Sequence, residues 1–123
     1  MSVQILVADD EPPIVDILAT VLEDEGYAIL RAYDGAMALE IFERERPALL
    51  ISDVMMPRLS GIDLAARVRA GAPEHQPPIV LISAAPPPPV ELADTIVLTK
   101  PFDIDEIVEL VATLLGGGAG GER

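Results

Sequence analysis

Carboxylates, a hydroxyl and an ammonium each stand at the end of an apolar run of this sequence. Asp9 and Asp10 follow the first run, and Asp53 follows the third. Ser83 ends the fourth run, and Lys100 follows the fifth. If the carboxylates converge, their mutual repulsion is unfavourable unless a cation lies among them. Hard oxygen ligands of this kind suit Mg²⁺, with Mn²⁺ as a substitute.

A phosphoryl group would complete such a site chemically. A divalent cation would neutralise the phosphoryl oxygens, an ammonium would hold them, and a hydroxyl would donate a hydrogen bond to them. A carboxylate could attack the phosphorus and form a covalent intermediate. The residue types therefore indicate phosphoryl chemistry at a magnesium site.

Lys100 is the only lysine of the chain, and the other seven basic residues are arginines. A compact ammonium on a flexible stem differs from a planar guanidinium in hydration and in hydrogen-bond geometry. In a chain that otherwise uses arginine, a single lysine after the fifth apolar run favours a specific role over chance.

The apolar runs alternate with amphipathic segments, which predicts alternating strands and helices. We predict strands at residues 3–8, 27–32, 48–52, 79–83 and 95–99, and helices at 12–25, 35–45, 60–69 and 104–115. The strands are nearly continuous in Val, Ile and Leu, as in sheets that are covered on both faces. This order predicts an α/β fold with a doubly wound, five-stranded parallel sheet, for which 2-1-3-4-5 is one common strand order. Strands one and three are then neighbours, which would bring the three aspartates to one edge.

The crossover between the fourth and fifth strands contains four consecutive prolines, at residues 86–89. Prolines have no backbone donor, fix their own φ and push the preceding residue away from the αR region. The crossover is also short, because Lys100 is the seventeenth residue after Ser83. We therefore predict that the fourth helix is shortened or replaced by a proline-rich loop, with at most one turn at residues 90–94.

Composition limits the class of protein. The chain has 123 residues and a net charge of −13, which suits one domain with its own core and argues against binding of nucleic acid or an anionic membrane. We predict a domain at residues 1–115 and a glycine-rich tail or linker at residues 116–123. No apolar run is long enough to span a membrane and no export signal precedes the first run, so a cytoplasmic location is expected. The absence of cysteine excludes disulfides and thiolate metal sites.

Four segments resemble the receiver domain of bacterial two-component response regulators. They are VADDEPP after the first strand, ISDVMMPRLSGIDL around the third, VLISA at the fourth and LTKPF after the fifth. They occur in the family's order at the matching strand ends, and the resemblance covers the chain up to its glycine tail. It implies a flavodoxin-like fold and a signalling domain, as opposed to an enzyme. The phosphoryl donor would be a histidine kinase or a phosphotransfer protein, and phosphorylation would switch binding to an unknown output protein or output domain.

The resemblance also implies roles for individual residues. Asp53 matches the phosphoacceptor, and Asp10 matches the acid that binds Mg²⁺ directly. Asp9 matches its neighbour in the acidic pocket, which often reaches the metal through water. The backbone carbonyl of Met55 would complete the protein ligands, and Ser83 matches the hydroxyl that bonds the phosphoryl oxygen.

Lys100 matches the lysine that pairs with the phosphoryl group, and the peptide bond that follows it is expected to be cis. Receivers usually place an aromatic residue three positions before this lysine, and its rotation reports the phosphoryl state. Here that position is Val97, whose side chain cannot swing a ring between two positions. The resemblance therefore implies intact phosphoryl chemistry with an unconventional readout of the signal.

Other functions fit parts of the pattern. A degenerate receiver would act as an interaction module without phosphorylation; Val97 and the proline segment leave this open, whereas the complete set of phosphoryl-site residues argues against it. An aspartate-nucleophile phosphohydrolase needs a second acid two residues after the nucleophile, where Met55 stands. A dinucleotide-binding enzyme needs a glycine-rich first turn, but the segment ADDEPP is acidic and repels pyrophosphate.

Taken singly, several residues have simpler explanations. Asp9 and Asp10 could form a solvated turn before a helix, where acids are favourable, and Ser83 could simply end a strand. The side chain of Met55 is expected to pack and not to react. His75, in the segment APEHQPP, is expected to lie in an exposed loop and to bind no metal.

Overall fold

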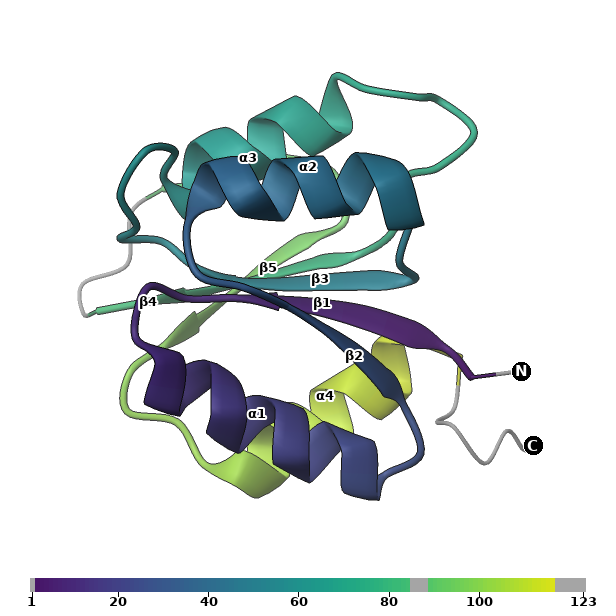
Figure 1. The fold of residues 1–123 in the computed structure, drawn as a ribbon, viewed down its shortest axis with the longest axis vertical. Helices are drawn as coiled ribbons and strands as arrows, with labels where there is room; N and C mark the ends of the chain where they lie inside the picture. Colours follow the sequence, from purple (N-terminus) through teal and green to yellow (C-terminus); the bar gives the residue numbers. More distant parts are fainter. Residues whose placement is uncertain (1, 85–88, 117–123) are drawn as a thin grey trace.

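The computed structural model describes residues 2–84 and 89–116 of the chain. Within these residues, five parallel strands and four helices form an α/β fold (Figure 1). The strands are β1 (Gln4–Ala8), β2 (Ala28–Ala32), β3 (Leu49–Asp53), β4 (Ile79–Ser83) and β5 (Thr95–Thr99), and the helices are α1 (Pro12–Asp24), α2 (Gly35–Glu45), α3 (Gly61–Arg69) and α4 (Ile104–Leu114). The sheet order is β2-β1-β3-β4-β5. The predicted fold class and strand order are therefore confirmed.

The central strands are buried on both faces of the sheet. Every residue of β3 and β4 is buried, and successive side chains of β1 alternate between two apolar clusters. Ile5 and Val7 belong to the cluster shared with α1 and α4, whereas Leu6 and Ala8 belong to the cluster shared with α2 and α3. Figure 1 shows the two helix pairs on opposite faces of the sheet. This double coverage is why the strands lack the apolar–polar alternation of half-exposed sheets.

Polar side chains mark the starts of three helices. Asp34 and Ser60 each accept a hydrogen bond from a backbone N–H in the first turn of α2 and α3, which satisfies a donor that the helix itself cannot pair. At α4 the carboxylate of Glu106 accepts from the backbone N–H of Asp103. None of the helices in residues 2–84 and 89–116 combines the length and the apolar character needed to cross a membrane.

The crossover from β4 to β5 contains no helix in its described part. Ala84 and residues 89–94 are described and none of them is helical, while residues 85–88, with three of the four prolines, lie outside the described residues. Ala93 and Asp94 form a turn before β5, with Asp94 at φ 50°. The prediction that the fourth helix is replaced is therefore confirmed for this part of the crossover. The predicted tail is described only at Gly116.

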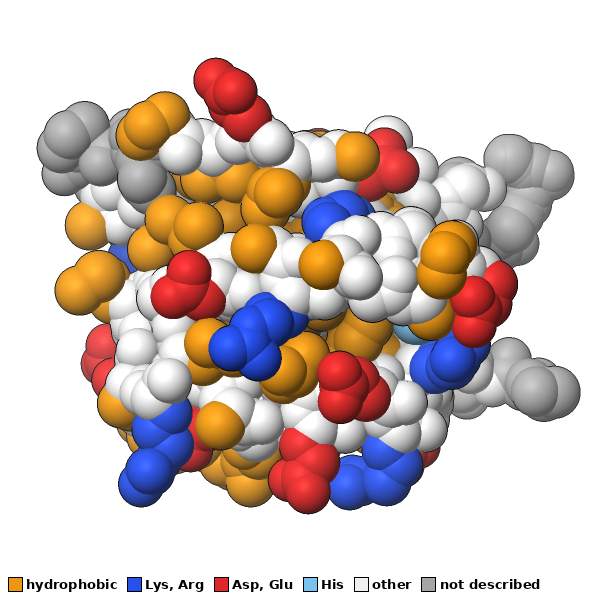
Figure 2. Space-filling view, turned by 90° about the horizontal axis from the view of Figure 1, so that it is seen from above, with side chains coloured by type: hydrophobic (Ala, Val, Ile, Leu, Met, Phe, Trp, Pro, Cys, Tyr) orange, Lys and Arg blue, Asp and Glu red, His pale blue; other side chains and the backbone are white. Residues whose placement is uncertain are grey.

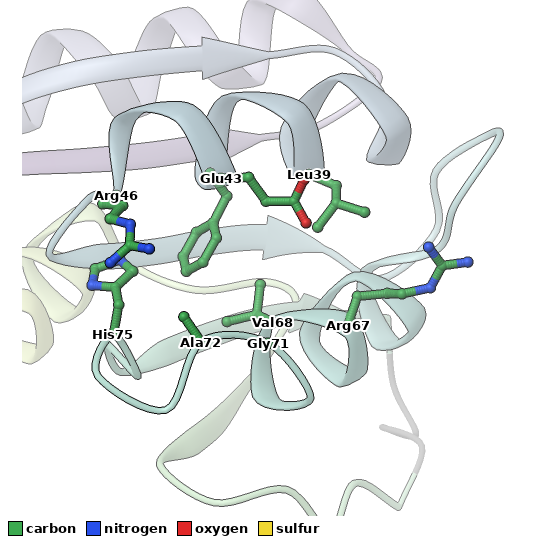
Figure 3. Close-up of a pocket in the computed structure, with 9 residues that line it drawn as sticks. Leu39, Glu43, Arg46, Arg67, Val68, Gly71, Ala72 and His75 are labelled. Carbon is green, nitrogen blue, oxygen red and sulfur yellow. The ribbon is translucent and has the colours of Figure 1, made fainter.

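His75 is placed differently from our expectation of an exposed residue. It does lie in a loop, but it is half-buried, with its ring centroid 5.1 Å from that of Phe42. It lines a cavity of about 180 Å³ between α2 and the α3–β4 connection (Figure 3). The expectation was wrong because the local sequence does not show that this connection folds back onto α2.

Gly61 begins α3 directly against the backbone of β3. A Cβ added at Gly61 would lie 2.1 Å from the carbonyl oxygen of Asp53, which is far inside van der Waals contact. We expect Gly61→Ala to lower the free energy of unfolding by about 2–4 kcal/mol, because α3 must move away from the strand end. Urea unfolding followed by circular dichroism measures this change.

Gly71→Ala is the control for this substitution. Its added Cβ would meet the carbonyl oxygen of Val68 at 3.3 Å, a contact that a small adjustment relieves, and we expect a loss below about 1 kcal/mol. Equal losses in the two variants would contradict the importance of the close approach at Gly61.

Candidate functional site

The sheet brings the three predicted acids together. Ala8 at the end of β1 pairs with Ser52 of β3, so the residues that follow these positions lie side by side. Carboxylate oxygens of Asp9, Asp10 and Asp53 all lie within 4.8 Å of one another. The convergence expected from the strand order is therefore present.

Asp9 is the most deeply placed of the three acids, at 2% exposure. Its Oδ1 accepts a hydrogen bond of 2.9 Å from the backbone N–H of Glu11, whereas its Oδ2 is buried with no hydrogen-bond partner. Burial raises the pKa of Asp9 to about 6, and the charge of Asp53 adds to the rise. A buried carboxylate oxygen with a free lone pair is a group that a hard cation would satisfy.

The three acids differ in their access to solvent. Asp10 is exposed, whereas Asp53 is buried at 6% exposure. The carboxylate oxygens of the three acids thus lie at different depths, from the surface to the interior. They are close enough together to coordinate one ion. Oxygen-only ligands with one open side fit Mg²⁺, which keeps several waters in protein sites. The residues present therefore fit the predicted metal.

Asp53 has partners at both carboxylate oxygens. Its Oδ1 lies 3.0 Å from Nζ of Lys100, and its Oδ2 accepts a 3.0 Å hydrogen bond from the backbone N–H of Met55. The hydrogen bond to Asp53 is the largest cause of a raised pKa of Lys100. The ammonium of Lys100 follows β5, two strands away from β3 in the sheet. It thus contacts the carboxylate of Asp53, which is one of the three clustered acids.

Ser83 lies next to this ion pair but does not join it. Its backbone carbonyl accepts a 2.8 Å hydrogen bond from the N–H of Lys100, which places it beside the lysine. Its hydroxyl donates to the carbonyl of Ala84 at 2.9 Å. A hydroxyl in this position needs only rotation about its χ1 torsion to turn away from that carbonyl.

The remaining predictions at the site concern backbone groups. The Lys100–Pro101 peptide bond is cis, as the resemblance implied. The side chain of Met55 is 75% exposed, which contradicts the expectation that it packs, and its backbone N–H contacts Asp53. The expectation failed because the loop after β3 turns this side chain to the surface.

Glu11 belongs to the electrostatics of the site, although we did not assign it a role from sequence. Its N–H fixes the orientation of Asp9, and its charge contributes to the raised pKa of Lys100. The available signal was its place as the third acid after the first apolar run. No spacing rule distinguishes it from an ordinary acid before a helix.

Comparison with known proteins gives one family. Residues 5–112 match the family model described as response regulator receiver domain. The probable transcriptional regulatory protein TcrX of Mycobacterium tuberculosis is 34% identical over an alignment of 118 residues, which covers 92% of this chain and 50% of that protein. The chain therefore spans about half the length of this relative.

Solved structures agree with this match. A putative response regulator from Chloroflexus aurantiacus has a TM-score of 0.81 at 30% identity, covering 94% of this chain and 98% of its own. The signal receiver domain of a signal transduction histidine kinase from Syntrophus aciditrophicus has a TM-score of 0.83 at 26% identity, covering 99% and 96%.

The raised pKa of Asp9 predicts that the metal-free protein loses stability as the pH rises. Between the ordinary pKa of 3.8 and about 6, the folded state binds more protons at Asp9 than the unfolded state does. The free energy of unfolding therefore falls across this window, by at most about 3 kcal/mol from this group. Urea unfolding in a chelator, from about pH 4 to about pH 7, measures the fall.

Asp9→Asn should remove this contribution, so the difference between the wild type and the variant should change across the window. Asp24→Asn, at an exposed position of α1, is the matched control and should follow the wild type. An Asp9→Asn curve parallel to the wild type at every pH would contradict the assignment.

Proposed function

The chain belongs to the response regulator receiver domain family, and we propose that it accepts a phosphoryl group on Asp53 in a Mg²⁺-dependent reaction. The observation that carries the proposal is the contact of 3.0 Å between Nζ of Lys100 and Oδ1 of Asp53, inside a cluster of three carboxylates. The family acts in two-component signalling, and we propose a phosphohistidine of a histidine kinase or phosphotransfer protein as the donor.

In the proposed step, a carboxylate oxygen of Asp53 attacks the phosphorus. A P–O bond forms while the P–N bond to the donor histidine breaks, and the electron pair of that bond stays on the imidazole. The ammonium of Lys100 exchanges its carboxylate partner for a phosphoryl oxygen. The N–H of Met55, which holds Oδ2 in place, keeps the carboxylate oriented during the exchange.

The metal would be held by the carboxylates of Asp10 and Asp53 and by the carbonyl of Met55, with Asp9 reaching it through water. When bound, Mg²⁺ supplies charge neutralisation at the phosphoryl oxygens. We propose that the hydroxyl of Ser83 turns from the Ala84 carbonyl to a phosphoryl oxygen. Slow attack of water on the phosphorus would later release phosphate and restore Asp53.

Phosphorylation would switch the binding of an output protein or output domain, and we propose that this occurs in the cytoplasm. No direct contact with nucleic acid or membrane is assigned to this domain, because its net charge is −13. On the face formed by α2 and α3, arginines and acids are interspersed and form no continuous basic surface (Figure 2). A basic or neutral protein surface fits this charge better.

A second candidate function is a degenerate receiver that binds partners without phosphorylation. Two observations favour it: Val97 occupies the position of the usual aromatic residue, and the described part of the β4–β5 crossover has no helix. These departures concern readout of the signal and leave the phosphoryl site unchanged. The proposed phosphorylation therefore remains the first choice.

Incubation with acetyl phosphate and Mg²⁺, followed by intact-protein mass measurement, separates the two functions. We expect the wild type to gain the mass of one phosphoryl group. The gain should be lost in Asp53→Asn and in the presence of a chelator, because the acceptor or the metal is then missing. Asp63→Asn, an exposed acid of α3, should still gain the mass. An unmodified wild type beside a competent control receiver would favour the degenerate function.

A further inference from the structure

The start of β5 is held by a side chain of α3, at the point where a crossover helix would otherwise lead into the strand. We propose that Arg69 is a positioning residue that, through β5, sets the ammonium of Lys100 against Asp53. The chemical importance of where Lys100 lies rests on the proposed phosphorylation. The effect of Arg69 on Lys100 can be tested whether or not the protein is phosphorylated.

The guanidinium of Arg69 binds two consecutive carbonyls of the crossover. Its Nε donates to the carbonyl of Ala93 at 2.5 Å, and its Nη2 donates to the carbonyl of Asp94 at 2.9 Å. A planar guanidinium presents donors in a fixed fork, so two contacts of this kind fix both the distance and the orientation of the turn. Hydrogen bonds from a charged donor are also stronger than neutral ones.

The remaining nitrogen of the Arg69 guanidinium, Nη1, is held by the connection that follows α3. Nη1 donates to Oε1 of Gln76 at 3.3 Å. The amide nitrogen of Gln76 donates to the carbonyls of Val68 at 3.3 Å and Ala72 at 2.9 Å. Gln76 therefore ties the turn after α3 to the last turn of that helix and orients the guanidinium at the same time.

One of the two carbonyls that Arg69 binds also takes part in the β4–β5 pairing, and the other accepts a local hydrogen bond in the turn. The carbonyl of Asp94 accepts a 2.9 Å hydrogen bond from the N–H of Ile79, the first residue of β4. The hydroxyl of Thr95 donates to the carbonyl of Ala93 at 3.0 Å. Arg69 thus binds a carbonyl that takes part in the first contact of the β4–β5 pairing, beside the pair of Ile79 with Thr95.

β5 transmits this register to the functional site. Lys100 follows β5 directly, and an extended strand of this length spans about 17 Å without changing length. The strand is at the edge of the sheet, and all five of its residues are only half-buried. Within the described residues, β5 pairs with β4 alone and no crossover helix covers it, so Arg69 adds a side-chain restraint at the start of the strand to the β4 ladder.

Arg67 provides a matched comparison two residues earlier on α3. It is exposed, and no hydrogen bond or ion pair holds it within the described ranges 2–84 and 89–116. It lines the cavity of Figure 3. Arg67→Met and Arg69→Met therefore remove the same charge from the same helix, and only the second removes the contact with Ala93 and Asp94.

The experiment follows the single lysine of the chain. With lysine labelled by ¹³C and ¹⁵N, Lys100 gives a single Nζ signal because it is the only lysine of the chain, and Asp53→Asn defines the position of that signal when the ion pair is broken. We expect Arg69→Met to move the Lys100 signal toward that of Asp53→Asn. Amide hydrogen exchange in β5 should also accelerate about tenfold or more, since the strand loses hydrogen bonds from a charged donor. Arg67→Met should leave both readouts at the wild-type values.

A Lys100 signal at its wild-type position in Arg69→Met, even with faster exchange in β5, would overturn the proposal and leave Arg69 a purely structural residue. If Arg69→Met does not fold, Gln76→Ala tests the same inference, because it leaves the guanidinium in place and removes its support, together with the hydrogen bonds from Gln76 to the carbonyls of Val68 and Ala72. We expect it to move the Lys100 signal in the same direction by a smaller amount, and no movement would again overturn the proposal.

Binding of beryllofluoride with Mg²⁺ distinguishes this inference from the proposed function. We expect Arg69→Met to bind this phosphoryl mimic about tenfold more weakly than Arg67→Met does, while its affinity for Mg²⁺ alone is unchanged, since β1 and β3 carry the acids. A wild type that binds no beryllofluoride would refute the proposed function, and the Lys100 signal would still decide the role of Arg69. Equal beryllofluoride affinities in the two variants would count against Arg69.

Discussion

The repulsion among three carboxylates is the constraint on which the rest of this structure depends. Asp9, Asp10 and Asp53 converge within 4.8 Å because β1 and β3 are neighbours, and this arrangement is unfavourable without a positive charge. Within the described residues, the cation in contact with this cluster is Lys100, which follows the edge strand β5. The acids after β1 and β3 therefore require that β5 be placed correctly, although β5 pairs with neither of these strands.

Burial increases the cost of this arrangement and also makes it chemically useful. The apolar clusters that cover both faces of the sheet remove water from Asp9, which raises its pKa and disfavours its charge. The same exclusion of water strengthens the attraction between Lys100 and Asp53. Close packing at Gly35 and Gly61, where a Cβ would clash with the backbone of Leu59 and Asp53, brings α2 and α3 near the strand ends. The site is thus an electrostatically unfavourable part of a well-packed domain.

The sequence predicted what depends on periodicity and on residues next to strand ends. The strands, the helices and the convergence of the acids followed from apolar runs, helix spacing and the position of Asp53 and Lys100. Contacts between segments far apart in the chain were not predictable, because no local pattern encodes them. The burial of Asp9 depends on both faces of the sheet, the packing of His75 depends on Phe42 of another helix, and the contact of Arg69 with Ala93 and Asp94 crosses more than twenty residues.

The short crossover changes how β5 is held. A crossover helix would secure the strand by burying apolar area, which is non-directional and tolerates small displacements. Here Val90 and Leu92 pack against the cluster of α2 and α3. The directional contacts with the turn before β5 come from the guanidinium of Arg69. Hydrogen bonds of this kind are directional and exchange readily with water. If Arg69 positions Lys100, a change at Asp53 would displace β5 as a whole through Lys100. Signal readout would then not require a rotating aromatic ring at position 97.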